Sequence, residues 1–108
     1  MFVTLWEYEV KPGSEERFEK AHGPDGDWVK LFRSDTHYYQ TRLVQDSLRR
    51  GVYLTIDFWD SQEAYEEFMA GHRAEYEAID AMAEDLTVKE RRIGCFEMVE
   101  GSSKPASK

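Results

Sequence analysis

The stretch Val52-Tyr53-Leu54-Thr55-Ile56-Asp57-Phe58-Trp59 decides the fold, because its side chains alternate with a period of two. Such alternation predicts a β-strand with the even-numbered side chains on one face and the odd-numbered ones on the other. The even face is entirely apolar, and the odd face carries Tyr53 and Trp59. Both faces of this strand are therefore expected to be covered by other parts of the protein.

The segments on either side of this strand predict the element order β-α-(α)-β-β-α-β. The first half comprises a strand over 2–10, a helix from Ser14 to about His22, a short helix capped by Asp27 and a strand over 37–46. After the strand over 52–59 come one long helix from Asp60 or Ser61 to about Leu86, a charged linker over 87–92 and a last strand over 93–99. Glu63 is placed to complete a capping box on Asp60 at the start of the long helix. This order is typical of the ferredoxin-like split βαβ fold, an α+β class with a four-stranded antiparallel sheet and helices on one face.

The second apolar face of the sheet predicts an interface. The helices of one chain cover one face only, and a bare apolar sheet face usually marks a binding surface. We therefore expect a homodimer in which two sheets pack face to face. The alternative is that the aromatic rings on that face are merely scattered.

Length and charge exclude several classes of protein. The chain has 108 residues and a formal net charge of -8, which disfavours nucleic acid and anionic membranes as partners. No apolar run reaches the roughly 20 residues of a membrane span, and the single cysteine, Cys95, fits a cytoplasmic protein. We expect one domain over residues 1–100 and a disordered tail over 101–108.

The strand and the helix after it carry a family resemblance. Trp59-Asp60-Ser61-Gln62-Glu63-Ala64-Tyr65 resembles the signature of the antibiotic biosynthesis monooxygenase family, in which a strand ends in Trp and acidic-Ser-x-x-Ala opens the next helix. Residues 6–13 are similar to that family's first strand and turn, and the resemblance covers about residues 1–100. It implies a dimeric α+β barrel. Some members oxidise polycyclic aromatic substrates with O₂ and no cofactor, others degrade haem, and many have no assigned activity.

The resemblance carries over only at some positions. The quinone-forming members use a strand Asn, the Trp at the strand end and a helix Tyr; Trp59 and Tyr65 match the last two, whereas Thr55 stands where the Asn would be. Arg73 is the nearest candidate for their Arg. Haem degradation is not indicated, because the three haem-site positions of the family are occupied by other residue types. Those positions hold Trp6, Phe68 and Ala78.

Two titratable residues are candidate catalytic groups. Asp57 lies mid-strand among apolar neighbours, where a carboxylate needs a partner or a raised pKa, so it would serve as a general base or form an ion pair with Arg42 or Arg33. His72 lies one turn before Tyr76 in the apolar stripe of the long helix. It would either relay a proton from a substrate or simply hydrogen-bond a carboxylate or carbonyl.

The aromatic residues and the other histidines complete the site hypothesis. Trp59 and Tyr65 would stack on a flat substrate, or would only pack in the core or the interface. His22 and His37 have no ligands at metal-binding spacing, so no metal is expected.

We hypothesise a small cytoplasmic enzyme that binds a flat phenolic or polyketide-like molecule between sheet and helices. His72 or Asp57 would remove a phenolic proton, and the anion would react with O₂ with no cofactor. The alternative is a non-catalytic dimeric module for small-molecule binding or assembly. The residues expected to line the cavity are Trp6, Tyr8, Thr55, Asp57, Trp59, Tyr65 and Tyr76.

Overall fold

A computed structural model of the chain describes residues 1–99 and 101. The predicted tail therefore lies outside the described residues except for Gly101. The elements are β1 (Phe2–Val10), α1 (Glu15–His22), α2 (Asp27–Phe32), β2 (Tyr38–Gln45), β3 (Val52–Trp59), α3 (Gln62–Gly71), α4 (Arg73–Ala83), a 3-10 turn η1 (Glu84–Leu86) and β4 (Thr87–Glu97).

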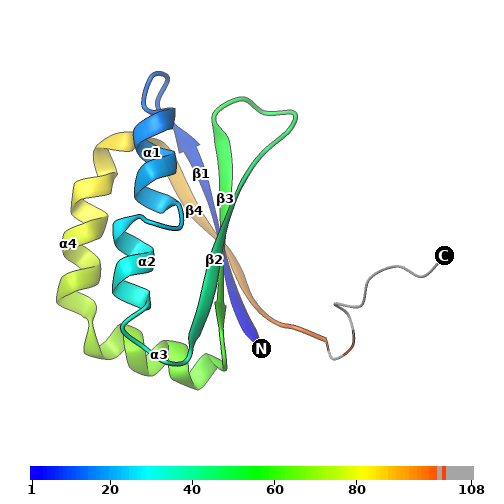
Figure 1. The fold of residues 1–108 in the computed structure, drawn as a ribbon. Coiled ribbons are helices and arrows are strands. Elements are labelled where there is room, and N and C mark those ends of the chain that lie inside the picture. The colour runs from blue at the N-terminus through cyan, green and yellow to red at the C-terminus, as the bar shows by residue number, and fades with distance from the viewer. Residues whose placement is uncertain (100, 102–108) are drawn as a thin grey trace.

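The strands form one antiparallel sheet in the order β2-β3-β1-β4, which confirms the ferredoxin-like α+β fold. The helices lie on one side of this sheet, and the described part of the chain leaves the other side uncovered (Figure 1). β1 is central, so its register positions the site: Thr4 lies opposite Asp57, and Trp6 opposite Thr55.

The core fills the space between the sheet and the helices with aromatic rings. Trp59 has no exposed surface and contacts Phe32, Tyr38 and Phe68 with ring centroids 5.2 to 5.4 Å apart. A second cluster surrounds Phe18, which is also fully buried. Most of the protein's aromatic rings therefore lie on the helix-covered face.

The predicted single long helix is wrong, because it is interrupted where Gly71 ends α3 and His72 precedes α4. The backbone of His72 leaves the helical region, with φ -125° and ψ 24°, yet its N–H still donates to the Phe68 carbonyl and its own carbonyl accepts from Tyr76. Glycine weakens a helix by about 1 kcal/mol relative to alanine, which favours a break here.

The predicted capping box on Asp60 is also wrong. Ser61 is the N-cap, and its hydroxyl accepts the Ala64 N–H at 3.1 Å. Asp60 instead contacts His37, whose Nδ1 lies 2.8 Å from the carboxylate. The short serine side chain therefore caps this helix, and the aspartate ties the helix start to the loop before β2.

The charged segment 87–92 is part of β4, so the predicted linker is wrong. It pairs with β1, with Glu90 opposite Tyr8 and Arg91 opposite Glu7. Charged residues are common on edge strands, where they oppose edge-to-edge pairing, and their presence hid the strand pattern. The alternation turns Glu90 toward the helices, whereas Arg91 forms an ion pair with Glu7 on the other face at 2.9 Å.

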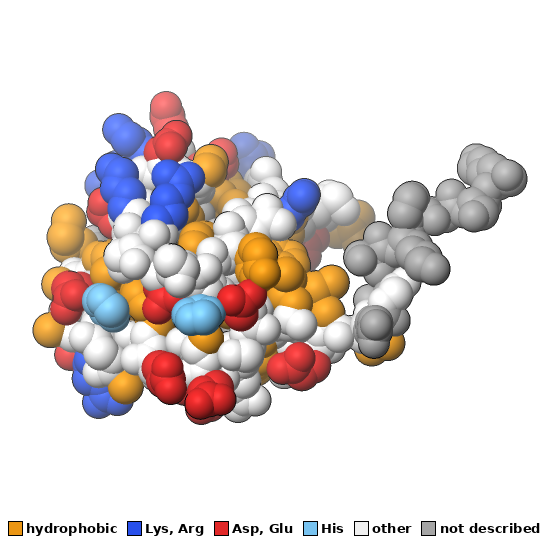
Figure 2. Space-filling view, turned by 60° about the horizontal axis from the view of Figure 1, so that its bottom comes forward, with side chains coloured by type: hydrophobic (Ala, Val, Ile, Leu, Met, Phe, Trp, Pro, Cys, Tyr) orange, Lys and Arg blue, Asp and Glu red, His pale blue; other side chains and the backbone are white. Residues whose placement is uncertain are grey.

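One part of the open face of the sheet is apolar, as the alternation of β3 predicts, whereas the part around Glu7 and Arg91 is charged. In the space-filling view, hydrophobic side chains gather on the side away from the helices (Figure 2). None of the helices in the described ranges is long and apolar enough to cross a membrane. The open-face set, defined by strand register, is Val3, Leu5, Leu54, Ile56, Phe58 and Phe96.

Candidate functional site

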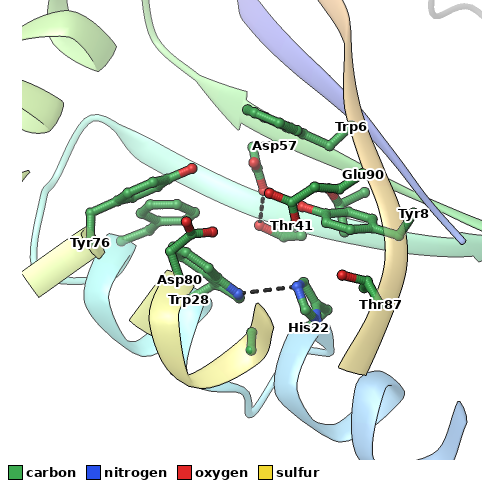
Figure 3. Close-up of a pocket in the computed structure, with 13 residues that line it drawn as sticks. Trp6, Tyr8, His22, Trp28, Thr41, Asp57, Tyr76, Asp80, Thr87 and Glu90 are labelled. Atoms are coloured by element: carbon green, nitrogen blue, oxygen red, sulfur yellow. Dashed lines mark hydrogen bonds between the residues drawn. The ribbon is translucent and has the colours of Figure 1, made fainter. Parts of the chain in front are cut away.

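A pocket lies between the sheet and helices α1, α2 and α4, and we call it the aromatic pocket. Its walls combine indole, phenol and phenyl rings with hydroxyl and carboxylate groups that reach in from the strands (Figure 3). The lining residues are Trp6, Tyr8, His22, Trp28, Phe32, Thr41, Thr55, Asp57, Tyr76, Asp80, Ala83, Thr87 and Glu90.

Strand alternation supplies the floor of the pocket. Trp6 and Tyr8 are two residues apart on β1, and Thr55 and Asp57 are two residues apart on β3, so each pair points to the helix-covered face. Because β1 and β3 are antiparallel neighbours, the two pairs lie side by side.

Asp57 is the polar centre of this floor. Its Oδ1 accepts a hydrogen bond from Thr41 Oγ1 at 2.6 Å, and its Oδ2 accepts from Thr4 Oγ1 at 3.3 Å. Neither predicted ion-pair partner is present: Arg42 is exposed and lies opposite Ile56, and Arg33 donates to the Pro24 carbonyl. Desolvation outweighs the two hydroxyl donors and raises the pKa of Asp57 to about 6.

A chain of hydroxyl groups leads to this carboxylate. Thr41 has one hydroxyl hydrogen, and its short contact with Asp57 uses it. The Tyr38 hydroxyl, 2.7 Å from Thr41 Oγ1, must then donate to Thr41. The order Tyr38 to Thr41 to Asp57 is therefore fixed, and every proton in the chain points toward the carboxylate.

His22 and Trp28 form a second polar pair in the wall. The Trp28 indole N–H donates to His22 Nε2 at 3.1 Å, so the imidazole carries its proton on Nδ1 and donates it to the Phe18 carbonyl at 3.3 Å. The imidazole is 4% exposed and stacks on the Phe18 ring at 4.1 Å. Burial lowers the pKa of His22 to about 4, so this histidine is neutral at physiological pH.

Two further carboxylates reach the pocket from its mouth. Asp80 comes from α4 and Glu90 from β4, and both point into the space in front of Asp57 (Figure 3). Burial and the neighbouring charges of Asp80 and Glu84 raise the pKa of Glu90.

Tyr76 separates the pocket from a larger groove. The aromatic pocket has a cavity volume of about 30 Å³, which is room for about two water molecules. The groove on the other side of Tyr76, between α3 and α4, has a volume of about 530 Å³. The Tyr76 ring packs on Trp28 with centroids 4.7 Å apart, so its displacement would join the two spaces.

The structure divides the residues that the sequence singled out. Five of them line the aromatic pocket, whereas the remaining three lie elsewhere. Trp59 is enclosed in the core, and its Nε1 has no hydrogen-bond partner. Tyr65 lines the groove, and His72 stacks on Phe68 at 4.1 Å and bonds its carbonyl through Nδ1 at 3.0 Å. The five that line the pocket are Trp6, Tyr8, Thr55, Asp57 and Tyr76.

Sequence reasoning missed part of the wall. Trp28 and Thr41 were recognised only as parts of a helix and a strand, and His22 was considered only as a metal ligand. One signal was available for Thr41: its strand neighbours β3, and a hydroxyl there can meet the odd face that carries Asp57. Among the residues that the structure describes, no group of three His, Cys, Asp or Glu side chains has the arrangement of a metal site.

Comparisons with known proteins agree with this fold. The sequence model of the family described as "Antibiotic biosynthesis monooxygenase" matches residues 1–79. A comparison with curated proteins finds no match.

Solved structures share the same architecture at low identity. A Nitrosomonas europaea protein named as an antibiotic biosynthesis monooxygenase has a TM-score of 0.70 at 13% identity, covering 92% of this chain and 99% of that one. SnoaB, a cofactor-independent oxygenase from Streptomyces nogalater, has a TM-score of 0.65 at 16% identity, with coverages of 95% and 97%. A Deinococcus radiodurans protein of the same description as the first has a TM-score of 0.69 at 14% identity, with coverages of 98% and 100%. These likenesses establish the fold.

Proposed function

Because this chain belongs to the antibiotic biosynthesis monooxygenase family, we propose that it oxidises a small phenolic or polyketide-like aromatic molecule with O₂. The substrate would bind in the aromatic pocket. One observation carries the proposal: a carboxylate with no cationic partner, Asp57, lies on the floor of a pocket that is walled by aromatic rings.

Asp57 is suited to act as the general base. A base works best when its pKa lies near the working pH, and burial raises the pKa of Asp57 to about 6. Thr41 and Thr4 orient the carboxylate, and its ionised form accepts their hydrogens. His72, the other candidate, does not line the pocket, so we assign the base to Asp57 alone.

The proposed reaction balances without an added reductant. A hydroxyarene and one O₂ give a quinone and one water, and the substrate supplies all four electrons. Asp57 takes the phenolic proton, and the electron-rich anion passes one electron to O₂. The two radicals join at a ring carbon to form a hydroperoxide. Loss of the ring proton and cleavage of the O–O bond then give the carbonyl and water. The chain's task is to bind, deprotonate and shield the substrate from water.

We propose that the working unit is a cytoplasmic homodimer. The sheet of a second copy would bury the apolar side chains of the open-face set, and exposed apolar patches of this kind usually mark interfaces. The single cysteine supports a reducing compartment. Thr55 stands at the position of the family's strand Asn, so we expect this chain to contact its substrate differently from the other quinone-forming members.

The test is oxygen uptake with an anthrone-type hydroxyarene such as 1,8-dihydroxyanthrone. We expect uptake above the spontaneous rate, with quinone formed in equal amount, and no quinone under nitrogen. Asp57→Asn should lower the rate at least about 100-fold, since a positioned base contributes about 10²- to 10⁴-fold. Asp25→Asn makes the same chemical change at an exposed loop residue and should leave the rate unchanged.

Two results would overturn the proposal. One is the absence of enhanced uptake across a panel of hydroxyarenes that the protein is shown to bind, which would leave a non-catalytic binding module. The other is full activity in Asp57→Asn, which would remove the base assignment.

A further inference from the structure

The aromatic pocket carries negative charge with no positive side chain in its wall. Asp57, Asp80 and Glu90 line it, whereas no Lys or Arg of the described part of the chain does. The only histidine of the wall, His22, is neutral because its pKa is lowered to about 4. An anionic substrate would meet repulsion from the carboxylates at the mouth and would find no counter-ion among the residues of the wall.

Nearby cations are directed elsewhere. Lys89 and Arg91, on either side of Glu90, face away from the pocket, and Arg91 forms an ion pair with Glu7. Arg92, one residue further, does not line the pocket and donates to the Cys95 thiol. Among the residues that the structure describes, no cation therefore lies against the carboxylates at the mouth.

The remaining walls are electron-rich ring faces. Trp6, Tyr8, Trp28 and Tyr76 come from three elements, β1, α2 and α4, and surround the same small space. The negative face of such a ring attracts a cation within about 6 Å of its centroid, and this attraction grows when the cation is desolvated. Rings and carboxylates together form the surroundings in which proteins hold organic ammonium groups.

We propose that the aromatic pocket selects a substrate that carries a protonated amine beside its aromatic ring. The ammonium group would lie between Asp80 and Glu90 at the mouth, with the reacting ring turned toward Asp57. The oxidation of this substrate rests on the proposed function, whereas its binding does not.

The amine also removes an electrostatic difficulty in the proposed reaction. Transfer of a phenolic proton to Asp57 keeps the total charge constant but leaves a phenolate facing Asp80 and Glu90. In a neutral substrate that anion would be repelled by both carboxylates. In an amine-bearing substrate the ammonium group lies between them and the phenolate, and it offsets the repulsion.

The test compares three phenols whose side arms begin with the same two methylene groups and end in groups of different charge. They are 3-(2-aminoethyl)phenol, which is cationic, 3-propylphenol, which is neutral, and 3-(3-hydroxyphenyl)propanoate, which is anionic. Binding is measured by calorimetry and by tryptophan fluorescence under nitrogen, so that no oxidation contributes. We expect the cationic probe to bind about tenfold more tightly than the neutral one, and the anionic probe to bind most weakly.

Substitution locates the cation. Asp80→Asn and Glu90→Gln should each reduce the preference for the amine over the neutral probe about three- to tenfold, while leaving the affinity for the neutral probe nearly unchanged. Glu75→Gln is the matched control, because Glu75 is exposed on the same helix as Asp80 and lines no described pocket.

Any of four results would overturn the inference. They are equal affinity for the amine and neutral probes, tighter binding of the carboxylate probe, no binding of the amine at millimolar concentration, and an equal effect of Glu75→Gln on the preference for the amine. The two proposals fail separately. If the protein prefers the amine but never consumes O₂, this inference stands and the proposed function is wrong. If it oxidises neutral hydroxyarenes without preferring the amine, the proposed function stands and this inference is wrong.

Discussion

Thr41 Oγ1 lies 2.6 Å from Asp57 Oδ1 and donates the shortest hydrogen bond that this carboxylate receives. The two residues come from neighbouring strands and are directly opposite each other in the register of β2 and β3. The chain therefore holds a carboxylate inside an aromatic pocket with hydroxyl donors rather than with a cation. This arrangement leaves the carboxylate costly to ionise and able to take a proton.

Asp57→Asn should stabilise the protein at high pH. The pKa of Asp57 is about 6 in the fold against 3.8 for the free side chain, so the folded state binds more protons between these values and stability falls as pH rises through them. Above pH 6 the folded protein bears the full cost of burying an ionised Asp57. Removal of this charge should add about 1–3 kcal/mol to the free energy of unfolding at pH 8. Urea denaturation should show this gain in the free energy of unfolding shrinking toward pH 4. A variant that is less stable than the wild type at both pH values would contradict this account.

Thr41→Val should raise the pKa of Asp57 further. It keeps the shape of the side chain but removes the donor that favours the charged form, and such a hydrogen bond is worth about one pKa unit or more. The Asp57 carboxyl carbon, followed by NMR, should titrate at higher pH, and the rise of oxygen uptake with pH should move with it. Thr41→Ser keeps the hydroxyl, so Asp57 should titrate in this variant as it does in the wild type. An unchanged titration of Asp57 in Thr41→Val would show that the hydrogen bond contributes little to the pKa of Asp57.

His22 should make the protein sensitive to mild acid. Its folded pKa of about 4 lies below the free value of 6.5, so the unfolded state binds more protons in this window and stability falls as pH drops through it. At pH 5 the loss should be about 2 kcal/mol relative to pH 7. His22→Phe should be less stable at pH 7, because Trp28 loses its acceptor, but its stability should lack this acid-dependent fall. A fall of the same size in both proteins would assign it to other groups.

Alternation and register explain which parts of the site were predictable. Trp6, Tyr8, Thr55 and Asp57 follow from the period of two along single strands, and the ferredoxin-like order makes those strands neighbours. The fold class followed from the same reasoning, because the alternation that identifies each strand lies within the strand's own segment of sequence.

Three placements that depend on packing between elements were not predicted. His72 fits the apolar stripe only if the helix is continuous, and the break after Gly71 removes it from the pocket. Thr41 reaches Asp57 through a strand pairing whose register shifts near Tyr38. His22 reaches Trp28 across the loop between α1 and α2. No period along the chain encodes these contacts.

Tyr76→Ala should open the aromatic pocket to the groove beside it. The cavity of about 30 Å³ does not hold an aromatic ring, and we expect a ligand to make room by displacing Tyr76, which also lines the groove. Removing that side chain should speed the association of 1-naphthol, followed by stopped-flow tryptophan fluorescence, about tenfold, while lowering the unfolding free energy by about 1–3 kcal/mol. Tyr76→Phe retains the ring and should bind at the wild-type rate. If both variants associate at that rate, entry does not pass Tyr76.

Ile56→Lys should separate the proposed dimer. Ile56 lies in the middle of the open-face set, opposite Leu5, and a lysine there would be buried without a partner when two sheets meet. Such a charge should raise the dissociation constant at least about 100-fold, as measured by sedimentation across a range of concentrations. Ala78→Lys adds the same charge on the exposed side of α4 and should leave the dimer intact.

Because the pocket lies on the opposite side of the sheet, an Ile56→Lys monomer that still binds 3-(2-aminoethyl)phenol would show that one chain forms the whole site. A dimer that survives Ile56→Lys, or a wild-type monomer, would instead mean that the open face contacts something other than its own copy.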